Sequence, residues 1–247
     1  MKVLIVHAHP EPKSFSSAMC ATAADALRSG GHELVVSDLY AQHFNPLASA
    51  VDFSERRDAN YLNYALEQRH ANGAGSVAPD IRAEMDKVLA CDLLILNFPI
   101  YWFSLPAILK GWIDRVFTSG VFYGGKRVYD RGGMRGRRAL VAATLGGREH
   151  MFGRGAMHGE LNGMLKPLLQ GTLGYVGFDV LTPFYAYHVP YLDATERTEI
   201  LVRWRETLAH LDSRQVLSMP SLEHFDDQFR PLTKTELEFQ PVGDIDG

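Results

Sequence analysis

The stretch from Leu93 to Val116 constrains the fold of this chain more than any other. It begins as an unbroken apolar run, breaks at Pro99, presents three aromatic residues at 101–103, and continues in a helical pattern. Ser104 is expected to cap that helix, with Pro106 in its first turn, where a missing N–H costs little. A buried strand, an aromatic turn and a helix in this order indicate the carboxyl end of a strand in an α/β sheet, where planar ligands bind.

Four further apolar runs bring the number of expected strands to five; they lie at 3–6, 34–36, 140–143 and 178–181. Most of them lack polar–apolar alternation, which is typical of strands buried on both faces of a parallel sheet. Helical patterns alternate with the runs, at 16–28, 80–89, 105–117, 166–176 and 193–211. The alternation predicts an α/β fold, a doubly wound five-stranded parallel sheet with helices on both faces and right-handed crossovers.

Two stretches interrupt this alternation. Residues 40–79 are too long for an ordinary connection, and their aromatic residues and charged centre predict a partly helical insertion over one edge of the sheet. Residues 213–247 contain three prolines and no clear strand or helix, so we expect a C-terminal tail on the surface or on a partner chain, with one turn near 235–239. The expected domain therefore spans 1–212 and the tail spans 213–247.

Composition excludes several classes of protein. With 247 residues, 46% of them hydrophobic, the chain is long and apolar enough to bury a core. A net charge of −4 gives no strong basic signature for nucleic acid, and two cysteines cannot form a disulfide framework. The apolar run before His7 is too short for a signal peptide, and no apolar segment reaches the length of about 18 residues that a membrane helix needs. A cytoplasmic protein without membrane insertion is expected.

Loops that can hold a ligand follow three of the predicted strands. After the first strand, Ser14–Ser17 opens a helix whose free N–H groups and dipole attract anions, although plain helix capping is the alternative. After the third, Pro99–Phe103 offers backbone N–H groups and aromatic faces to a flat heterocycle, or packs as a core cluster. After the fourth, Thr144–Gly147 ends in two glycines, which let a ligand approach the backbone closely. Three such loops on one sheet edge predict a binding site.

Two other patterns in the sequence do not predict a further binding site. The G-x-G-x-x-G fingerprint of dinucleotide-binding folds is absent, and the glycines at 153–159 have the wrong spacing and no preceding strand. His7 and His9 lie on one side of a strand and are able to chelate a metal, but no third ligand is evident. We therefore predict no metal site.

Five motifs in the chain match a known family: HAH at 7–9 followed by SF and AM within 14–19, SDLYAQHFNPL at 37–47, FPIYWFSLPAILKGWIDRVF at 98–117, ATLGG at 143–147 and MHGE at 157–160. The third motif is the longest and the most specific. Through these motifs the chain resembles the flavodoxin-like NAD(P)H:quinone oxidoreductases, the DT-diaphorase group. The resemblance covers roughly residues 2–212, and the tail does not match.

The resemblance implies a homodimer that binds FAD without a covalent bond, with FMN as the less favoured alternative. The residues that it assigns to the cofactor lie in the three loops and near the start of the last helix. They are His9, Phe15, Ser16 and Ser17 for the pyrophosphate and ribityl groups, Pro99, Ile100, Tyr101, Trp102 and Phe103 for the isoalloxazine, Thr144, Leu145, Gly146 and Gly147 for its polar edge, and Arg197 near the adenosine phosphates.

The activity implied by the resemblance is two-electron reduction of quinones by NADH or NADPH. Hydride passes to the flavin and then to the quinone in ping-pong order, because one slot holds one ring at a time. The implied pocket for nicotinamide and quinone is formed by Phe103, Tyr123, Phe152 and His158. His158 and the N–H groups of Gly146 and Gly147 are the expected catalytic groups, since they can stabilise negative charge on the flavin. The alternative for His158 is a structural imidazole.

Two departures from the family pattern stand in this pocket. Phe152 replaces the tyrosine of the family and has no O–H to donate. Gly125 replaces a second tyrosine, which predicts a more open pocket. Other functions remain open: a nitro- or azo-compound reductase, a one-electron carrier, or a regulatory flavoprotein ancillary to a potassium-efflux system. The modest net charge of −4 argues against the carrier.

Overall fold

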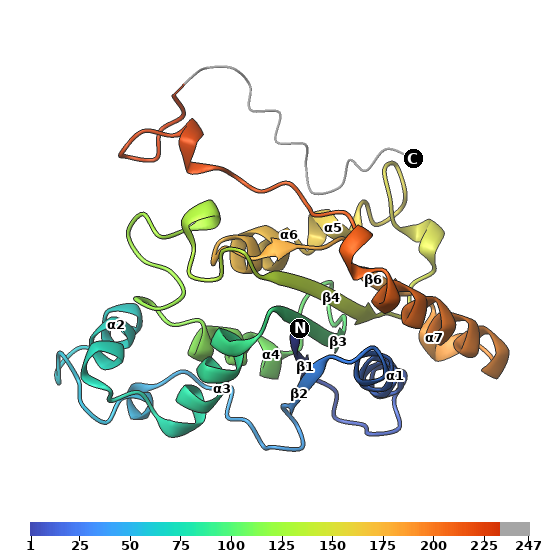
Figure 1. The fold of residues 1–247 in the computed structure, drawn as a ribbon, viewed down its shortest axis with the longest axis horizontal. Coiled ribbons are helices and arrows are strands. Elements are labelled where there is room, and N and C mark those ends of the chain that lie inside the picture. The colour runs from blue at the N-terminus through green and yellow to red at the C-terminus, as the bar shows by residue number, and fades with distance from the viewer. Residues whose placement is uncertain (233–247) are drawn as a thin grey trace.

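The computed structural model describes residues 1–232, and a parallel sheet runs through its centre (Figure 1). Its strands are β1 (Lys2–His7), β2 (Glu33–Asp38), β3 (Leu93–Pro99), β4 (Arg138–Thr144) and β5 (Asp179–Val180), in the order β2-β1-β3-β4-β5. This confirms the predicted doubly wound architecture. A sixth strand, β6 (Phe184–Ala186), was not predicted; it pairs with the carboxyl end of β4, while β5 pairs with the first two residues of β4.

Helices cover both faces of the sheet. α1 (Phe15–Ser29) and α7 (Ala194–Ala209) pack together on one face, where Val3 and Ile5 of β1 meet them. α3 (Pro79–Ala90) and α4 (Ala107–Val116) lie on the other face, against Leu4 and Val6. Successive side chains of a strand point to opposite faces, so these apolar runs supply both cores. All seven residues of β3 are buried, as the absence of alternation predicted.

The edge strand β2 departs from that expectation. Val35 and Val36 are 40% and 36% exposed, because β2 has a neighbouring strand on one side only. The apolar pattern of β2 resembles that of a central strand and so predicted full burial. At the edge of the sheet β2 is only partly covered.

The region between β4 and β5 is less regular than the single helix predicted at 166–176. Its helices are α5 (Leu161–Met164), α6 (Lys166–Leu168) and a π-helical turn over Leu169–Gly174. Pro167 lacks an N–H, which interrupts regular helix hydrogen bonding, and Gly174 leaves room for the sulfur of Met219. Short 3-10 turns complete the described chain, at Ala50–Asp52, Tyr129–Arg131, Glu149–Met151, Val189–Tyr191, Leu211–Ser213 and Leu222–His224.

The stretch 40–79 contains α2 (Tyr64–Ala74) and is joined to α4 by a buried ion pair. The guanidinium of Arg115 donates to the carboxylate of Asp52 at 2.8 Å, and both side chains are almost fully buried. Burial alone would raise the pKa of Asp52, but hydrogen bonds from Arg115, Tyr64 and the Ser49 amide outweigh it and hold that pKa below its ordinary value. Arg115 also pairs with Asp80 at 2.7 Å, so one cation connects three segments.

Helix α7 begins one residue after the predicted start at 193, and Asp193 caps it. The Asp193 carboxylate accepts a hydrogen bond from the Glu196 amide at 2.9 Å, and the Glu196 carboxylate accepts one from the Asp193 amide at 2.8 Å. This reciprocal capping box satisfies two N–H groups at the start of the helix.

The described part of the tail runs beside β5. The Leu217 amide donates to the Val180 carbonyl at 2.8 Å, and the Ser221 hydroxyl donates to Asp130 at 2.9 Å. The turn expected at 235–239 lies outside the described residues. Among residues 1–232, no helix combines the length and the apolar character that a membrane span requires.

Candidate functional site

A cavity of about 340 Å³ opens at the carboxyl ends of β1, β3 and β4. Ten of the residues expected to hold the cofactor line it: His9, Phe15, Ser16, Pro99, Ile100, Tyr101, Thr144, Leu145, Gly146 and Arg197. Ser14, from the expected anion-binding loop, lines it as well, and three further lining residues were not expected: Lys13, Val189 and Pro190. The three loops singled out in the sequence therefore form one cavity.

The start of α1 forms one wall of the cavity. The Ser14 hydroxyl caps the helix by accepting a hydrogen bond from the Ser17 amide at 3.1 Å. The amides of Phe15 and Ser16 donate to no protein acceptor within residues 1–232. Unpaired N–H groups at a helix start, with Lys13 and Arg197 on the same cavity, favour a negatively charged ligand.

The serines that follow Phe15 have different neighbours. The Ser16 hydroxyl shares a buried hydrogen bond of 2.8 Å with the Thr144 hydroxyl and so joins α1 to the loop after β4. Ser17 does not line the cavity; its hydroxyl donates to the Glu11 carbonyl at 3.0 Å and lies 3.1 Å from Nε2 of His7. His9 lines the cavity, and burial lowers its pKa, which favours a neutral ring at neutral pH.

The loop after β3 makes a tight turn through two aromatic residues. Tyr101 and Ser104 exchange backbone hydrogen bonds of 3.1 and 2.9 Å across the turn. Trp102 and Phe103 between them have φ angles of 50° and 56°, a left-handed conformation that is unusual for bulky side chains. The prediction that Ser104 caps the next helix is wrong, because Ser104 closes this turn and α4 begins after Pro106. Strain of this kind persists at sites where the surrounding structure enforces it.

The aromatic side chains of this turn point in different directions. Trp102 does not line the cavity and is 96% exposed. Phe103 is also outside the cavity, but its ring centroid lies 5.3 Å from that of His158. Tyr101 lines the cavity. The turn thus separates Tyr101, which lines the cavity, from Phe103 beside His158 and from Trp102, which is exposed to solvent.

The loop after β4 is held by its backbone. The Leu145 amide donates to the Ala186 carbonyl at 3.0 Å, and the His188 amide donates to the Gly147 carbonyl at 2.8 Å. A Cβ atom on Gly147 would come within 2.7 Å of the Phe152 ring, so a larger residue there would have to displace the ring or the loop. Within the described residues, the amides of Gly146 and Gly147 donate to no protein acceptor. They remain available to a ligand.

A row of rings continues from this loop. Phe152 lies 5.2 Å from His158 and 5.8 Å from Tyr187, measured between ring centroids. Three of the residues expected in the acceptor pocket, Phe103, Phe152 and His158, are therefore neighbours. Tyr187 was not expected; burial raises its pKa to about 12, so its hydroxyl keeps its proton at neutral pH.

Tyr123 lies apart from that row. Its ring neighbour is Tyr175 at 5.7 Å, and none of the ring contacts within residues 1–232 joins Tyr123 to Phe103, Phe152 or His158. The described chain alone does not bring the fourth expected pocket residue to the site.

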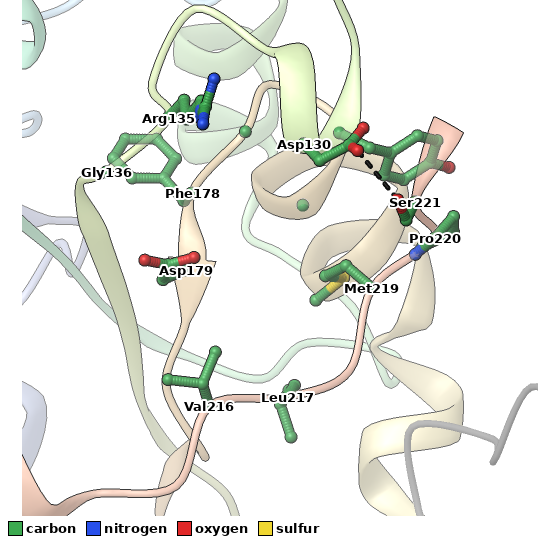
Figure 2. A pocket seen from close by; sticks show the side chains of 13 residues that line it. Asp130, Arg135, Gly136, Phe178, Asp179, Val216, Leu217, Met219, Pro220 and Ser221 are labelled. Carbon is green, nitrogen blue, oxygen red and sulfur yellow. Dashed lines mark hydrogen bonds between the residues drawn. The ribbon is translucent and has the colours of Figure 1, made fainter. Parts of the chain in front are cut away.

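A second cavity of about 380 Å³ lies at the opposite end of β4 (Figure 2). It is enclosed by the tail at 216–221, by Asp179 at the start of β5, and by the turn that carries Asp130 and Arg135. None of the expected site residues lines it. Lysine and arginine residues are frequent between 126 and 138, close to this cavity, and three of them are engaged within the protein. Lys126 pairs with Asp227, Arg138 pairs with Asp212, and Arg137 donates to carbonyls at the end of α3. A structural hairpin explains these three cations.

The strand order and the cavity at the carboxyl edge define a flavodoxin-like protein, in which ligands bind where the strand order reverses. A family model described as flavodoxin-like fold matches residues 1–208. NAD(P)H dehydrogenase (quinone) 1 of Cavia porcellus is 39% identical over 240 residues, which cover 96% of this chain and 87% of that protein. The chain therefore belongs to the flavodoxin-like NAD(P)H:quinone oxidoreductase family.

Two further comparisons agree. Ribosyldihydronicotinamide dehydrogenase (quinone) of Homo sapiens is 37% identical over 225 residues, covering 91% of this chain and 97% of that protein. A solved structure from Klebsiella pneumoniae, assigned as a quinone reductase, superposes with a TM-score of 0.86 at 31% identity and covers 100% of this chain and 97% of its own. Because the alignments extend well past residue 212, the expectation that the tail has no counterpart in relatives was wrong.

Proposed function

We propose that this protein is a flavin-dependent NAD(P)H dehydrogenase that reduces quinones by two electrons. The observation that carries the proposal is the set of unpaired backbone N–H groups after two strands, β1 and β4, whose loops border one cavity. Phe15 and Ser16 offer donors to phosphate oxygens, and Gly146 and Gly147 offer donors to the polar edge of a flat ring. The family match supports the same assignment.

The residues present fit a flavin with an adenosine diphosphate arm. Lys13 and Arg197 add positive charge to the cavity that the start of α1 also faces, which suits a pyrophosphate. We therefore propose FAD as the cofactor, with FMN as the alternative. Arg197→Leu should weaken FAD binding roughly tenfold and leave FMN binding nearly unchanged, because FMN lacks the second phosphate. Equal losses for the two flavins would favour FMN.

When bound, the flavin supplies the hydride acceptor and donor of the reaction. The loops after β3 and β4 would hold the ring, because both line the cavity. The Gly146 and Gly147 amides would donate to negative charge on the ring, and His158 would hold or release a proton as that charge changes. Phe103 and Phe152, on either side of His158, make the adjoining surface apolar, which suits a nicotinamide or a quinone ring.

We further propose a homodimer in the cytoplasm, with residues 1–212 as the flavin-binding unit and 213–247 as its tail. A second copy gives Tyr123 a route to the site that the single chain does not provide. Analytical ultracentrifugation of wild type and Tyr123→Ala, together with the KM for the quinone, tests this: a monomeric wild type would contradict it.

The test of the proposed function starts from the purified full chain. We expect bound flavin in its absorbance spectrum, identified by mass spectrometry after denaturation, and loss of flavin colour when NADH or NADPH is added without oxygen. Dihydronicotinamide riboside belongs in the donor set because of the human relative. A quinone should restore the colour. Faster turnover with nitro or azo compounds would reassign the acceptor, and failure to bind either flavin would refute the proposal.

A further inference from the structure

The corner that follows β6 contains a histidine to which neither the motifs nor the proposed function gives a role. His188 precedes the 3-10 turn Val189–Tyr191, and its backbone is left-handed, with φ 58° and ψ 18°. A non-glycine residue in this conformation is uncommon and carries strain, which persists where the surrounding structure enforces it. Three hydrogen bonds connect this corner to the loop after β4.

The three bonds hold three successive carbonyl groups of that loop. The Val189 amide donates to the Leu145 carbonyl at 3.1 Å, and the His188 amide donates to the Gly147 carbonyl at 2.8 Å. Between them, Nδ1 of the His188 ring lies 3.2 Å from the Gly146 carbonyl oxygen. A carbonyl oxygen can only accept, so Nδ1 carries the hydrogen of this bond whether the ring is neutral or charged.

The fixed carbonyl groups fix the amides that share their peptide units. A trans peptide points its N–H away from its C=O, so the Gly146 amide points away from Val189 and the Gly147 amide points away from the His188 ring. Within residues 1–232, neither amide donates to a protein acceptor. Glycine on both sides gives the 146–147 peptide unusual freedom to rotate. The His188 ring therefore keeps this peptide in the orientation that leaves the Gly147 N–H available to a ligand.

The corner is itself anchored, so it can hold the loop in place. β6 pairs with the carboxyl end of β4, and the Tyr191 amide closes the turn on the His188 carbonyl at 3.0 Å. The Tyr191 ring lies 4.8 Å from the imidazole, measured between ring centroids, and restricts its rotation. Of the three bonds to the loop, only the one from the imidazole can be removed by a side-chain substitution that leaves the backbone bonds in place.

We propose that His188 is a positioning residue that raises the two-electron reduction potential of the bound flavin. Its ring bond fixes the Gly147 N–H as a donor before charge develops, and a hydrogen bond on the carbonyl of the same peptide polarises that N–H. A fixed, polarised donor stabilises the negatively charged reduced ring more than the neutral oxidised ring. This inference rests on the proposed function, because it needs the Gly147 amide to meet a flavin.

The test compares the two redox states of the flavin-loaded full chain. The potential is measured by enzymatic reduction in the presence of a reference dye, and the dissociation constant of the oxidised flavin is measured by fluorescence. His188→Gly removes the ring and suits the left-handed backbone. We expect this variant to lose roughly two- to tenfold more affinity for the reduced than for the oxidised flavin, the range for one hydrogen bond. A tenfold difference corresponds to a potential about 30 mV lower.

Two variants serve as matched controls. His188→Asn tolerates the left-handed backbone and carries an amide N–H where the imidazole has Nδ1, so it should recover at least half of the lost potential. His210→Asn removes an imidazole at the far end of α7, whose Nδ1 lies 2.8 Å from the Glu206 carbonyl. It should keep the wild-type potential.

A measurement on the wild type needs no variant. Nitrogen NMR of the flavin-loaded protein should show a hydrogen on Nδ1 of His188, and a ring with its hydrogen on Nε2 alone would overturn the proposal.

The remaining outcomes separate this role from a structural one and from the proposed function. A structural role for His188 would weaken the binding of both redox states equally and leave the potential unchanged. That result, or a lowered potential in His188→Gly that His188→Asn does not recover, would overturn the role of the ring and leave the proposed function intact. A wild type that binds neither FAD nor FMN would end both.

Discussion

The loops after β3 and β4 meet at one sheet edge, yet they are built in opposite ways. The loop after β3 presents large side chains on a strained backbone, with Trp102 almost fully exposed. The loop after β4 presents bare backbone, held by Ala186 and His188 and covered by Phe152. The comparison separates two ways of making a planar site: side chains supply contact area in one loop, and fixed amides supply donors in the other.

The largest effect is expected in the loop after β4. Gly147→Val places atoms where the Phe152 ring lies and must displace the ring or the loop. We expect a loss of about 1–3 kcal/mol in the free energy of unfolding, as for overpacked cores, together with loss of flavin retention. Thermal melts and flavin titrations measure both.

Gly146→Ala is the matched control for this substitution. A Cβ atom at position 146 would meet nothing closer than Pro190 at 3.9 Å, so the fold should tolerate it. If Gly147→Val had the Tm and the flavin affinity of wild type, the conclusion that this loop is tightly packed against Phe152 would be wrong.

In the loop after β3 we expect binding and stability to separate. Trp102 lies outside the cavity, next to Tyr101 in the turn, and we expect a bound flavin ring to reach its exposed indole. Trp102→Ala should then weaken flavin retention by roughly two- to tenfold, the value of one aromatic contact, without lowering Tm, because the side chain is exposed. Trp102→Gly should weaken retention equally and raise stability by about 1 kcal/mol, because it relieves the positive φ. Gel filtration followed by flavin quantification, with Tyr61→Ala as an exposed aromatic control, decides the point. Unchanged occupancy would remove Trp102 from the site.

The smallest effect is expected at Phe152, whose ring lies beside both Gly147 and His158. Phe152→Tyr adds a hydroxyl beside His158 and Gly147, and one new hydrogen bond of about 0.5 kcal/mol corresponds to roughly a twofold change in rate. We expect faster flavin reduction or an altered pH profile in stopped-flow experiments. If neither changes, the missing hydroxyl of this chain is immaterial.

The sequence predicted a strand and its ligand loop correctly where an unbroken apolar run marks a buried strand. β1, β3 and β4 are unbroken apolar runs, and their ends identify the loops that form the cavity. It did not predict β6, because Phe184–Ala186 is too short to show a period. The left-handed turn was not predicted, because glycine normally occupies such positions and Trp102 and Phe103 stand there instead. Ser104 matched a cap by residue type, but its backbone was already engaged with Tyr101.

Residues that line the cavity from other elements were also missed. Val189 and Pro190 reach it because β6 brings the chain back to β4, a long-range contact that no local pattern reports. Lys13 immediately precedes the predicted loop Ser14–Ser17, and its positive charge was a usable signal. Tyr187 follows β6 directly, so the sequence could have placed it beside Phe152 only if β6 had been predicted.

Arg115 joins the stretch 40–79 to α4, and its ion pair with Asp52 limits the substitutions that these two segments tolerate. Loss of Arg115 alone would leave the Asp52 carboxylate buried without a counter-charge, at a cost of about 3–5 kcal/mol, whereas joint replacement of the pair by apolar residues can be neutral. Positions 52 and 115 are thus expected to covary among relatives. A graft of the 40–79 stretch between two such enzymes should succeed only when residue 115 travels with it.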